Sequence, residues 1–229
     1  MRDDILSYRD MCERENVQTL QRGMNFRLRH GYSLVLMSRR PNAPYLDRIL
    51  ADGVTIEYEG HDTPKTSRRV DPKKVDQPRF LPTRKPTQNG LFAQAVEETR
   101  LGTRSPEVVH VYEKVLPGVW SDKGPFELVD YKTVSDGRRM VFKFYLRAME
   151  TPEPRAQSRE ASGISRLIPS EVKKEVWKRD KGRCVICGAA DNLHFDHDIP
   201  WSKGGSSITA RNVKILCARH NIQKHDKIE

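Results

Sequence analysis

The sequence predicts an α+β protein with a mostly β domain in front and a small metal-stabilised domain behind it. Three observations predict this: strand-like segments dominate the front part, a polar run follows, and paired cysteines stand near the end. The polar run over residues 151–168 contains prolines and serines but no aromatic residue, which is typical of a linker. We therefore expect a segment of unassigned role at residues 1–22, a β domain at 23–150 and a second domain at 169–229.

The composition is that of a polar but foldable chain with a positive charge. Hydrophobic residues make up 36% of the 229 residues, charged residues make up 31%, and the formal net charge is +10. An excess of basic residues favours a partner with phosphate groups, such as a nucleic acid. The alternative is a soluble protein that is basic but binds no nucleic acid. No apolar run reaches the roughly 18 residues of a membrane span, and the start lacks a signal-peptide layout. We expect a cytoplasmic protein with reduced thiols, so paired cysteines indicate metal rather than disulfide.

Local patterns place the expected strands and helices. Segments rich in β-branched or aromatic residues predict strands. These segments are residues 32–37, 108–112, 126–129 and 141–146. A polar helix is expected over residues 3–20. Helix signals return at Ser170, which suits an N-cap, and at Glu171, which suits the first turn.

Three of the four cysteines form part of two hooks of equal gap. Cys12 stands alone, whereas Cys184 and Cys187 form one hook and Cys217 and His220 form the other. Together they make a Cys₃His set, which is typical of a closed tetrahedral zinc site. Zinc would supply on the order of 10–16 kcal/mol of apparent folding energy to a segment too small for a large core. The alternative is three buried thiols and a surface histidine.

Polar residues in a particular order lie between and beside these hooks. They are Asp196 and His197, then Gly204 and Gly205, then Asn212, and finally Asn221 and Lys224. Over residues 177–226 this order resembles the HNH, or ββα-metal, nuclease family. The resemblance implies a zinc-stabilised ββα-metal fold and a metal-dependent DNA endonuclease.

The resemblance also implies a role for each residue. His197 is the expected general base, because an imidazole titrates near neutral pH. Asp196 and Asn221 are expected to hold a hard divalent cation such as Mg²⁺, and Lys224 to touch a phosphate. Asn212 is expected to hydrogen-bond across the loop, the alternative being an ordinary turn residue. Because neighbours on a strand point to opposite faces, Asp196 and His197 can share a site only where the strand bends or ends.

A basic segment interrupts the β domain between Lys65 and Lys85. Its composition is compatible with a solvated loop or with contacts to DNA phosphates. The candidate DNA-binding residues are Lys65, Arg68, Arg69, Lys73 and Lys74.

The β domain has a scattered resemblance of its own. Tyr45-x-Asp47 and Tyr58-Glu59-Gly60 precede the basic segment, and Gly124-Pro125-Phe126 follows it. Over residues 29–148 this order resembles the SRA (YDG) family, whose PUA-like barrel flips a modified cytosine out of duplex DNA. The resemblance implies that Tyr45 and Tyr58 stack on the flipped base, that Asp47 reads its edge, and that the basic segment is a finger loop.

Two positions depart from the SRA pattern. The family's Tyr-Asp-Gly is replaced by Asp122-Lys123-Gly124, and Glu59 stands where the family has a small hydroxyl residue. Asp52 is an alternative reading carboxylate, and strand packing is the alternative role for Tyr45 and Tyr58.

The two resemblances together predict an endonuclease that cuts near 5-methyl- or 5-hydroxymethylcytosine and so restricts modified or phage DNA. One alternative is an HNH nuclease with an unmodified or other DNA target. Another is a non-catalytic, zinc-containing DNA-binding regulator, although the full HNH set argues against it. A single HNH set serves one strand, so a homodimer, in solution or on DNA, is expected to make double-strand breaks. The linker is expected to let the nuclease domain move relative to the β domain.

Overall fold

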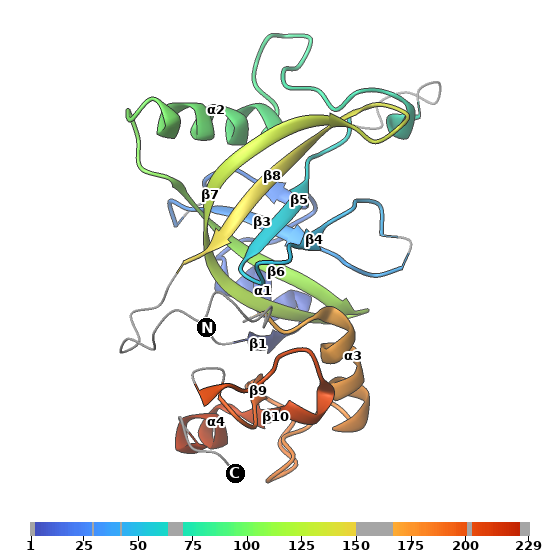
Figure 1. The fold of residues 1–229 in the computed structure, drawn as a ribbon, viewed down its shortest axis with the longest axis vertical. Helices are drawn as coiled ribbons and strands as arrows, with labels where there is room; N and C mark the ends of the chain where they lie inside the picture. The colour runs from blue at the N-terminus through green and yellow to red at the C-terminus, as the bar shows by residue number, and fades with distance from the viewer. Residues whose placement is uncertain are drawn as a thin grey trace.

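The computed structural model describes residues 3–28, 30–41, 43–63, 71–149, 167–200 and 203–224. Four helices and ten strands lie in this part of the chain (Figure 1). In order they are β1 (Asp3–Leu6), α1 (Tyr8–Arg14), β2 (Met24–Asn25), β3 (Ser33–Met37), β4 (Arg48–Ile49), β5 (Thr55–Glu59), α2 (Gln88–Arg100), β6 (Glu107–Leu116), β7 (Val119–Ser135), β8 (Met140–Ala148), α3 (Ser170–Arg179), β9 (Leu193–His197), β10 (Val213–Cys217) and α4 (Ala218–Lys224). Short 3-10 turns cover Pro72–Lys74 and Ala210–Asn212.

All ten strands belong to one sheet with the strand order β10-β9-β1-β7-β6-β3-β2, from which β8, β5 and β4 branch at β7. The predicted mostly β domain is present, but the predicted closed barrel is not, because no strand pairing among the described residues closes the sheet. The 17-residue β7 explains the curvature that remains. Its front part pairs with β6 and its rear part with β8, and a bulge lies between Leu128 and Asp130.

The β domain, which comprises β2 to β8 and α2, encloses the larger core. Its strands contain the four segments predicted from β-branched and aromatic residues. Phe92 and Val96 of α2 are buried against the concave side of the strands, beside Phe144. We did not expect α2, which begins at the N-cap Thr87. A Cβ at Gly90 would stand 2.3 Å from the Arg79 carbonyl oxygen, so the first turn of this helix requires glycine.

The N-terminal segment is not the predicted polar helix. Residues Asp3–Leu6 form a strand, and the short α1 follows with a capping box between Ser7 and Asp10. Met11 of α1 packs on the outer side of the sheet, against a cluster that includes Trp120. The helical pattern was weak because only one face of a seven-residue helix is apolar.

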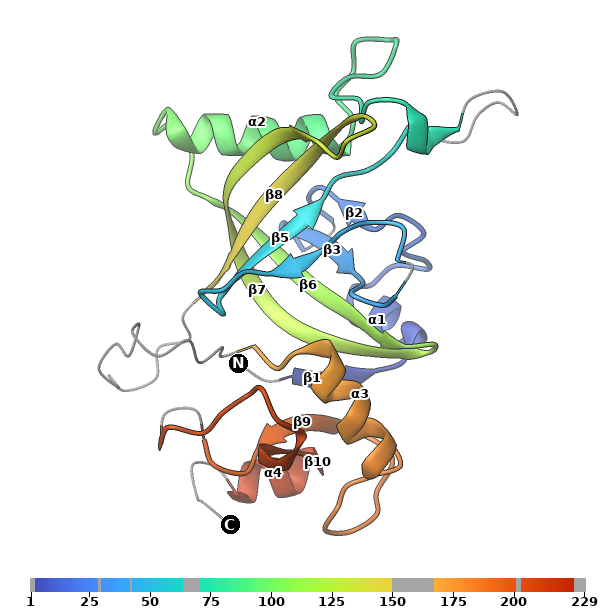
Figure 2. The ribbon, with the colours of Figure 1, turned by 45° about the vertical axis from the view of Figure 1, so that its right-hand side comes forward.

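β1 joins the two parts of the molecule. It pairs on one side with β7, where Asp4 lies opposite Asp122, and on the other with β9, where Asp4 lies opposite His194. Figures 1 and 2 show β1 between the long curved strands and the smaller unit below them. The prediction of a nuclease domain that moves freely does not fit this shared strand. The linker at 151–168 lies almost wholly outside the described residues.

The C-terminal module, which comprises α3, β9, β10 and α4, has its own small core. Val176 of α3 is buried with Phe195 of β9 and Ile215 of β10. α3 begins where predicted, but its N-cap is Pro169. Ser170 instead donates a hydrogen bond from its hydroxyl to the buried Glu113 of β6. None of the helices in the described ranges is both long and apolar enough to cross a membrane.

Candidate active site and base-binding site

The last three elements form a hairpin followed at once by a helix. β9 and β10 pair antiparallel, with His197 opposite Val213 and Leu193 opposite Cys217. α4 begins at the next residue, Ala218. β9 ends at His197, which is the condition under which Asp196 and His197 can serve one site.

The four predicted zinc ligands lie together at the base of this unit. One ligand atom from each of Cys184, Cys187, Cys217 and His220 falls within 4.8 Å of the others. The His220 Nδ1 atom is 3.4 Å from the Cys184 sulfur and 3.3 Å from the Cys217 sulfur. Burial opposes ionisation of Cys184, but hydrogen bonds from the backbone at Cys187 and Cys217 lower the pKa of its thiol to about 6. Thiolate and imidazole donors at this separation fit a tetrahedral zinc ion.

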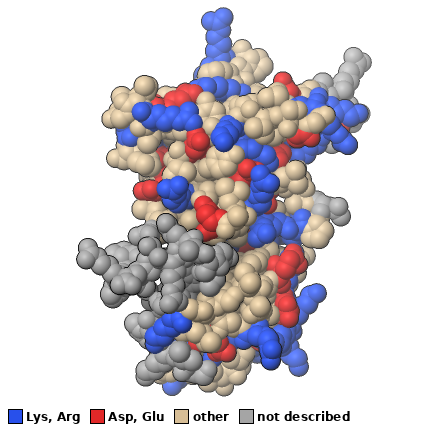
Figure 3. All heavy atoms as spheres, in the orientation of Figure 1, with Lys and Arg blue, Asp and Glu red and all other residues tan. Residues whose placement is uncertain are grey.

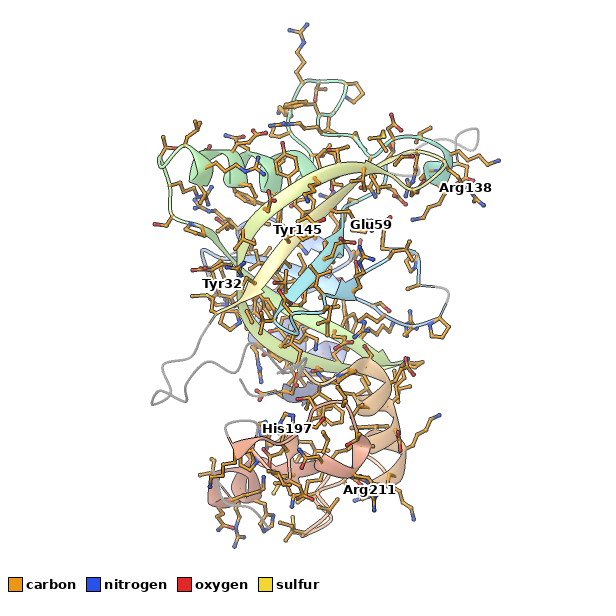
Figure 4. The ribbon with its side chains drawn as sticks, in the orientation of Figure 1. Tyr32, Glu59, Arg138, Tyr145, His197 and Arg211 are labelled. Carbon is orange, nitrogen blue, oxygen red and sulfur yellow. The ribbon has the colours of Figure 1, made fainter. Side chains whose placement is uncertain are left out.

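His197 is held at the end of β9 by a side-chain contact. Its Nε2 atom is 2.8 Å from the hydroxyl of Ser207, which is fully buried. Burial lowers the pKa of His197, so the imidazole is neutral at neutral pH and can accept a proton. The sequence did not single out Ser207, which follows the Gly204-Gly205 pair by two residues and had no metal-ligand or catalytic spacing to mark it. Figure 4 places His197 on the side of the C-terminal module that faces the β domain.

Asn212 ties together the two ends of the loop between β9 and β10. Its side-chain oxygen accepts a hydrogen bond from the Ile199 amide at 2.8 Å, and its side-chain nitrogen donates to the Ile199 carbonyl at 3.1 Å. The same nitrogen donates to the Ser206 carbonyl at 3.0 Å. A Cβ at Gly205 would stand 1.8 Å from the Ile199 carbonyl oxygen, so the loop closes only with glycine there. These contacts are of the kind expected for Asn212.

Lys224 does not lie where a phosphate contact requires it. Its side chain is 1% exposed, and its ammonium is 2.6 Å from the carboxylate of Asp196. It also donates to the backbone carbonyl of His197. Lys224 was predicted to lie on the same face of the helix as Asn221. In the structure its long side chain reaches β9 rather than solvent.

The candidate site for a hard cation comprises Asp196 and Asn221. The Asp196 carboxylate is 23% exposed and already faces a positive group, the Lys224 ammonium. Asn221 is half-buried on α4. A carboxylate and an amide oxygen are the donors that Mg²⁺ or a similar ion prefers, so the residues fit such an ion.

Asp47 lies at the centre of the second candidate site, in the β domain. Its two carboxylate oxygens accept hydrogen bonds from the Ser38 and Glu59 amides, each at 3.0 Å. Burial raises the pKa of this carboxyl to about 7, so it is substantially protonated near neutral pH. Asp52 instead caps its own turn through Thr55, which removes it as a reading carboxylate.

Two aromatic side chains stand beside Asp47. Tyr58 is buried, and its hydroxyl donates to the Gly23 carbonyl at 2.8 Å. Burial and then the charge of Asp47 raise the pKa of the Tyr58 hydroxyl. Tyr45 is half-buried and stacks on His61, with ring centroids 6.4 Å apart. The three predicted pocket residues therefore lie in one region.

His61 and Lys73 also belong to this region, although no sequence pattern predicted either residue there. Burial lowers the pKa of His61 to about 4, so its ring is neutral beside Tyr45. The Lys73 ammonium lies 4.1 Å from the centroid of the Tyr45 ring and 2.8 Å from Asp62. Of the predicted DNA-binding residues, Lys73 thus packs over the Tyr45 ring and Lys74 is exposed to solvent. Lys65, Arg68 and Arg69 lie outside the described residues.

The charged side chains do not form a patch of one sign on the face shown in Figure 3. Lys and Arg are spread over the β domain and the C-terminal module, and Asp and Glu lie among them. Many of the basic groups of the described residues are paired, as Arg79 is with Glu97 at 2.6 Å and Arg100 is with Asp130. The net charge of +10 is therefore spread along the molecule.

Comparison with known proteins supports the assignment of the C-terminal module. Residues 184–227 match the HNH endonuclease family. This match covers the zinc cluster, β9, β10 and α4, so the chain contains an HNH endonuclease module, as predicted. The curated proteins give no match.

Several solved structures are similar in fold. The SRA domain of SUVH5 bound to fully methylated CG DNA has 17% identity and a TM-score of 0.43, over 66% of this chain and 90% of that one. The same domain bound to fully hydroxymethylated CG DNA has 17% identity and a TM-score of 0.44, over 68% and 93%. The modification-dependent restriction endonuclease TagI has 18% identity and a TM-score of 0.41, over 97% and 76%.

Proposed function

We propose that this protein is a modification-dependent DNA endonuclease. In this proposal the β domain binds a modified cytosine, 5-methyl- or 5-hydroxymethylcytosine, flipped out of the duplex, and the HNH module hydrolyses a nearby phosphodiester bond. The observation that carries the proposal is that Asp196 and His197 stand next to each other at the end of β9, in the same hairpin-and-helix unit as the Cys₃His cluster, within residues that match the HNH family.

In the HNH module each residue has a distinct task. His197, neutral and fixed through Ser207, accepts the proton of the attacking water. Asp196 and Asn221 would hold a divalent cation through oxygen donors of the kind that Mg²⁺ prefers, and this cation would supply positive charge to the phosphate when bound. Lys224 orients the Asp196 carboxylate, and Asn212 fixes the loop that follows His197.

In the β domain the chemistry is that of base capture. Flipping a base costs a few kcal/mol, and stacking on an aromatic ring returns about 1–3 kcal/mol. Tyr45, which is half-buried, provides a ring for stacking. The Tyr58 ring is 2% exposed and belongs to the hydrophobic core, so this structure favours strand packing as its role. The Asp47 carboxyl, with a pKa of about 7, is available as an acceptor for the cytosine amino group in its ionised form.

The zinc assignment gives a first prediction. Purified protein should contain about one zinc per chain, and Cys187→Ser should lose most of it, because three ligands hold zinc less well than four. Cys12→Ser is the matched control, since Cys12 is a buried residue of α1 that belongs to a different cluster, with Tyr112 and Trp120. Metal analysis of the three proteins decides the matter. Equal zinc in Cys187→Ser and wild type would remove Cys187 from the site.

The base-binding site gives a second prediction. Tyr45→Ala should weaken binding to modified DNA by about 5- to 150-fold, the equivalent of about 1–3 kcal/mol of stacking, and change binding to unmodified DNA much less. Tyr145→Ala is the control, because this half-buried tyrosine of β8 alternates with the core residue Phe144. Affinities for matched duplexes should be measured for both variants. Equal losses on both duplexes would argue for strand packing at Tyr45.

The single HNH set gives a third prediction. Because one His197 serves one strand per binding event, double-strand breaks should require two chains, most simply related by a two-fold axis. On a supercoiled plasmid, nicked circles should dominate at low enzyme concentration and linear product should rise more steeply than in proportion to enzyme. Linearisation by a demonstrably monomeric enzyme, without nicked intermediate, would contradict this.

A different DNA target remains the second candidate, and the Asp122-Lys123-Gly124 departure favours it. Lys123 is fully buried and paired with Glu113 at 2.8 Å, so this segment serves the interior of the molecule rather than a DNA surface. A nuclease of this kind would cut modified and unmodified DNA at equal rates.

A further inference from the structure

The strand β1 contacts both functional parts of the molecule at once. Ile5 lies opposite Ser121 of β7, and Asp3 lies opposite Phe195 of β9. The next residue of the same β9 strand after Phe195 is Asp196. Only one strand, β1, therefore lies between the β domain and the strand that carries the candidate catalytic residues.

Four charged side chains are buried directly beside β1. Asp3 comes from β1, Glu113 from β6, Lys123 from β7 and Lys173 from α3, and the last three are 0% exposed. The Lys173 ammonium is 2.6 Å from the Asp3 carboxylate and 3.7 Å from that of Glu113. The Lys123 ammonium is 2.8 Å from Glu113. The two positive and two negative groups balance only when α3 and β1 are both seated on the sheet.

Hydrogen bonds complete this cluster and tie it to both parts. The Ser121 hydroxyl donates to Asp3 at 2.9 Å, and the Lys173 ammonium donates to the Ser121 oxygen at 2.6 Å. A second link lies on the other side of β1, where Asp4 is 2.8 Å from the Nδ1 atom of His194 and 3.1 Å from Arg14. His194 belongs to β9 and Arg14 to α1.

We propose that β1 and the Asp3–Lys173–Glu113–Lys123 cluster lock the HNH module onto the β domain in one orientation. The lock is a specificity element: it places the catalytic residues at a fixed distance from the captured base, so that the linker does not set the position of the cut. The part of this proposal that concerns the position of the cut rests on the proposed function. The part that concerns the fixed orientation of the HNH module rests only on the strand pairing and the burial of the charged cluster.

The physical argument is that separation leaves the charges without partners. Withdrawing α3 removes Lys173 from Asp3 and Glu113, and withdrawing β9 leaves the backbone groups of β1 unpaired on that side. Both changes are unfavourable, because buried charges and unpaired strand edges need compensation. A module held only by a flexible tether as long as residues 150–166 would range over about 20–25 Å. That range corresponds to roughly six or seven base pairs of B-DNA at about 3.4 Å per step.

The first test does not depend on any enzymatic activity. A specific protease site is inserted between residues 157 and 158 of the full chain, and the protein is cut there and passed over a sizing column. The two pieces are expected to stay together, since β1 is in the first piece and β9 in the second. Adding Ile5→Pro, which a paired strand does not accept, should separate them, whereas Glu13→Gln, an exposed carboxylate of α1, should not. Separation of the wild-type pieces would overturn the proposal.

The second test measures the cut position. A duplex with one 5-methylcytosine is digested, and the ends are sequenced. Ten glycine and serine residues inserted between residues 157 and 158 should leave the cut positions unchanged, whereas Asp3→Asn with Asp4→Asn should spread them by up to six or seven base pairs. Cut positions that shift with the inserted linker would overturn the proposal. If no modified duplex is cut at all, the proposed function fails, and the sizing experiment still decides the lock.

Discussion

Replacing His197 with alanine is expected to lower the rate of DNA cleavage by about 10²–10⁴-fold, the usual contribution of a positioned general base. DNA binding should be unchanged, because in the proposed function binding depends on residues of the β domain that contact the base and the phosphate backbone rather than on His197. Single-turnover nicking and an equilibrium binding assay, run side by side, measure the two effects.

Gln223→Ala is the matched control for this variant, since Gln223 is an exposed residue of α4 that follows the zinc ligand His220 by three positions. It should cut at the wild-type rate. Asp196→Ala and Asn221→Ala should lose cleavage as His197→Ala does, because each removes an oxygen donor from the candidate cation site. Near wild-type cleavage by His197→Ala would exclude this histidine as the base.

Replacing Lys173 with methionine is expected to destabilise the protein by about 3–5 kcal/mol, the usual cost of removing one partner from a buried ion pair. The ammonium of Lys173 is fully buried, and its loss leaves Asp3 without its nearest positive group at 2.6 Å. Denaturant unfolding with zinc present measures the change.

Lys174→Met is the natural control, because the two lysines are neighbours on α3. Lys174 pairs with Glu171, whose side chain is 75% exposed although that of Lys174 is only 14% exposed. A pair that is open to solvent on one side is screened by water and contributes little to stability. Its substitution should change the unfolding free energy by less than about 1 kcal/mol. Equal effects of the two substitutions would show that the buried cluster contributes no more than a surface pair.

The sequence predicted the features that depend on nearby residues. The hooks at Cys184 and Cys217 specify their own geometry because a two-residue gap places both ligands on one side of a turn, and the Cys₃His cluster has the predicted members. Parts of four strands of the β domain, β3, β6, β7 and β8, were predicted because β-branched or aromatic residues gather within a few positions there, whereas β2, β4 and β5 were not predicted. Ser170 was misassigned as an N-cap because its true partner, Glu113, is far away in the sequence.

The features that the sequence missed depend on distant pairings. β1 was taken for part of a helix, because the strands that pair with it begin more than a hundred residues later. Lys224 was expected to face a phosphate, because helical spacing gives the side of the helix but not what packs on it. The same holds for the contact of His194 with Asp4, which depends on the pairing of β1 with β9.

The central claim is tested most directly by digestion of matched plasmids that differ only in cytosine, 5-methylcytosine, 5-hydroxymethylcytosine or glucosylated cytosine. Wild-type protein with Mg²⁺ should cleave plasmid with 5-methyl- or 5-hydroxymethylcytosine and leave unmodified plasmid intact, and His197→Ala should cleave none. Equal cleavage of all four plasmids by wild type would contradict the reading of a modified base, and no cleavage of any would contradict the nuclease itself.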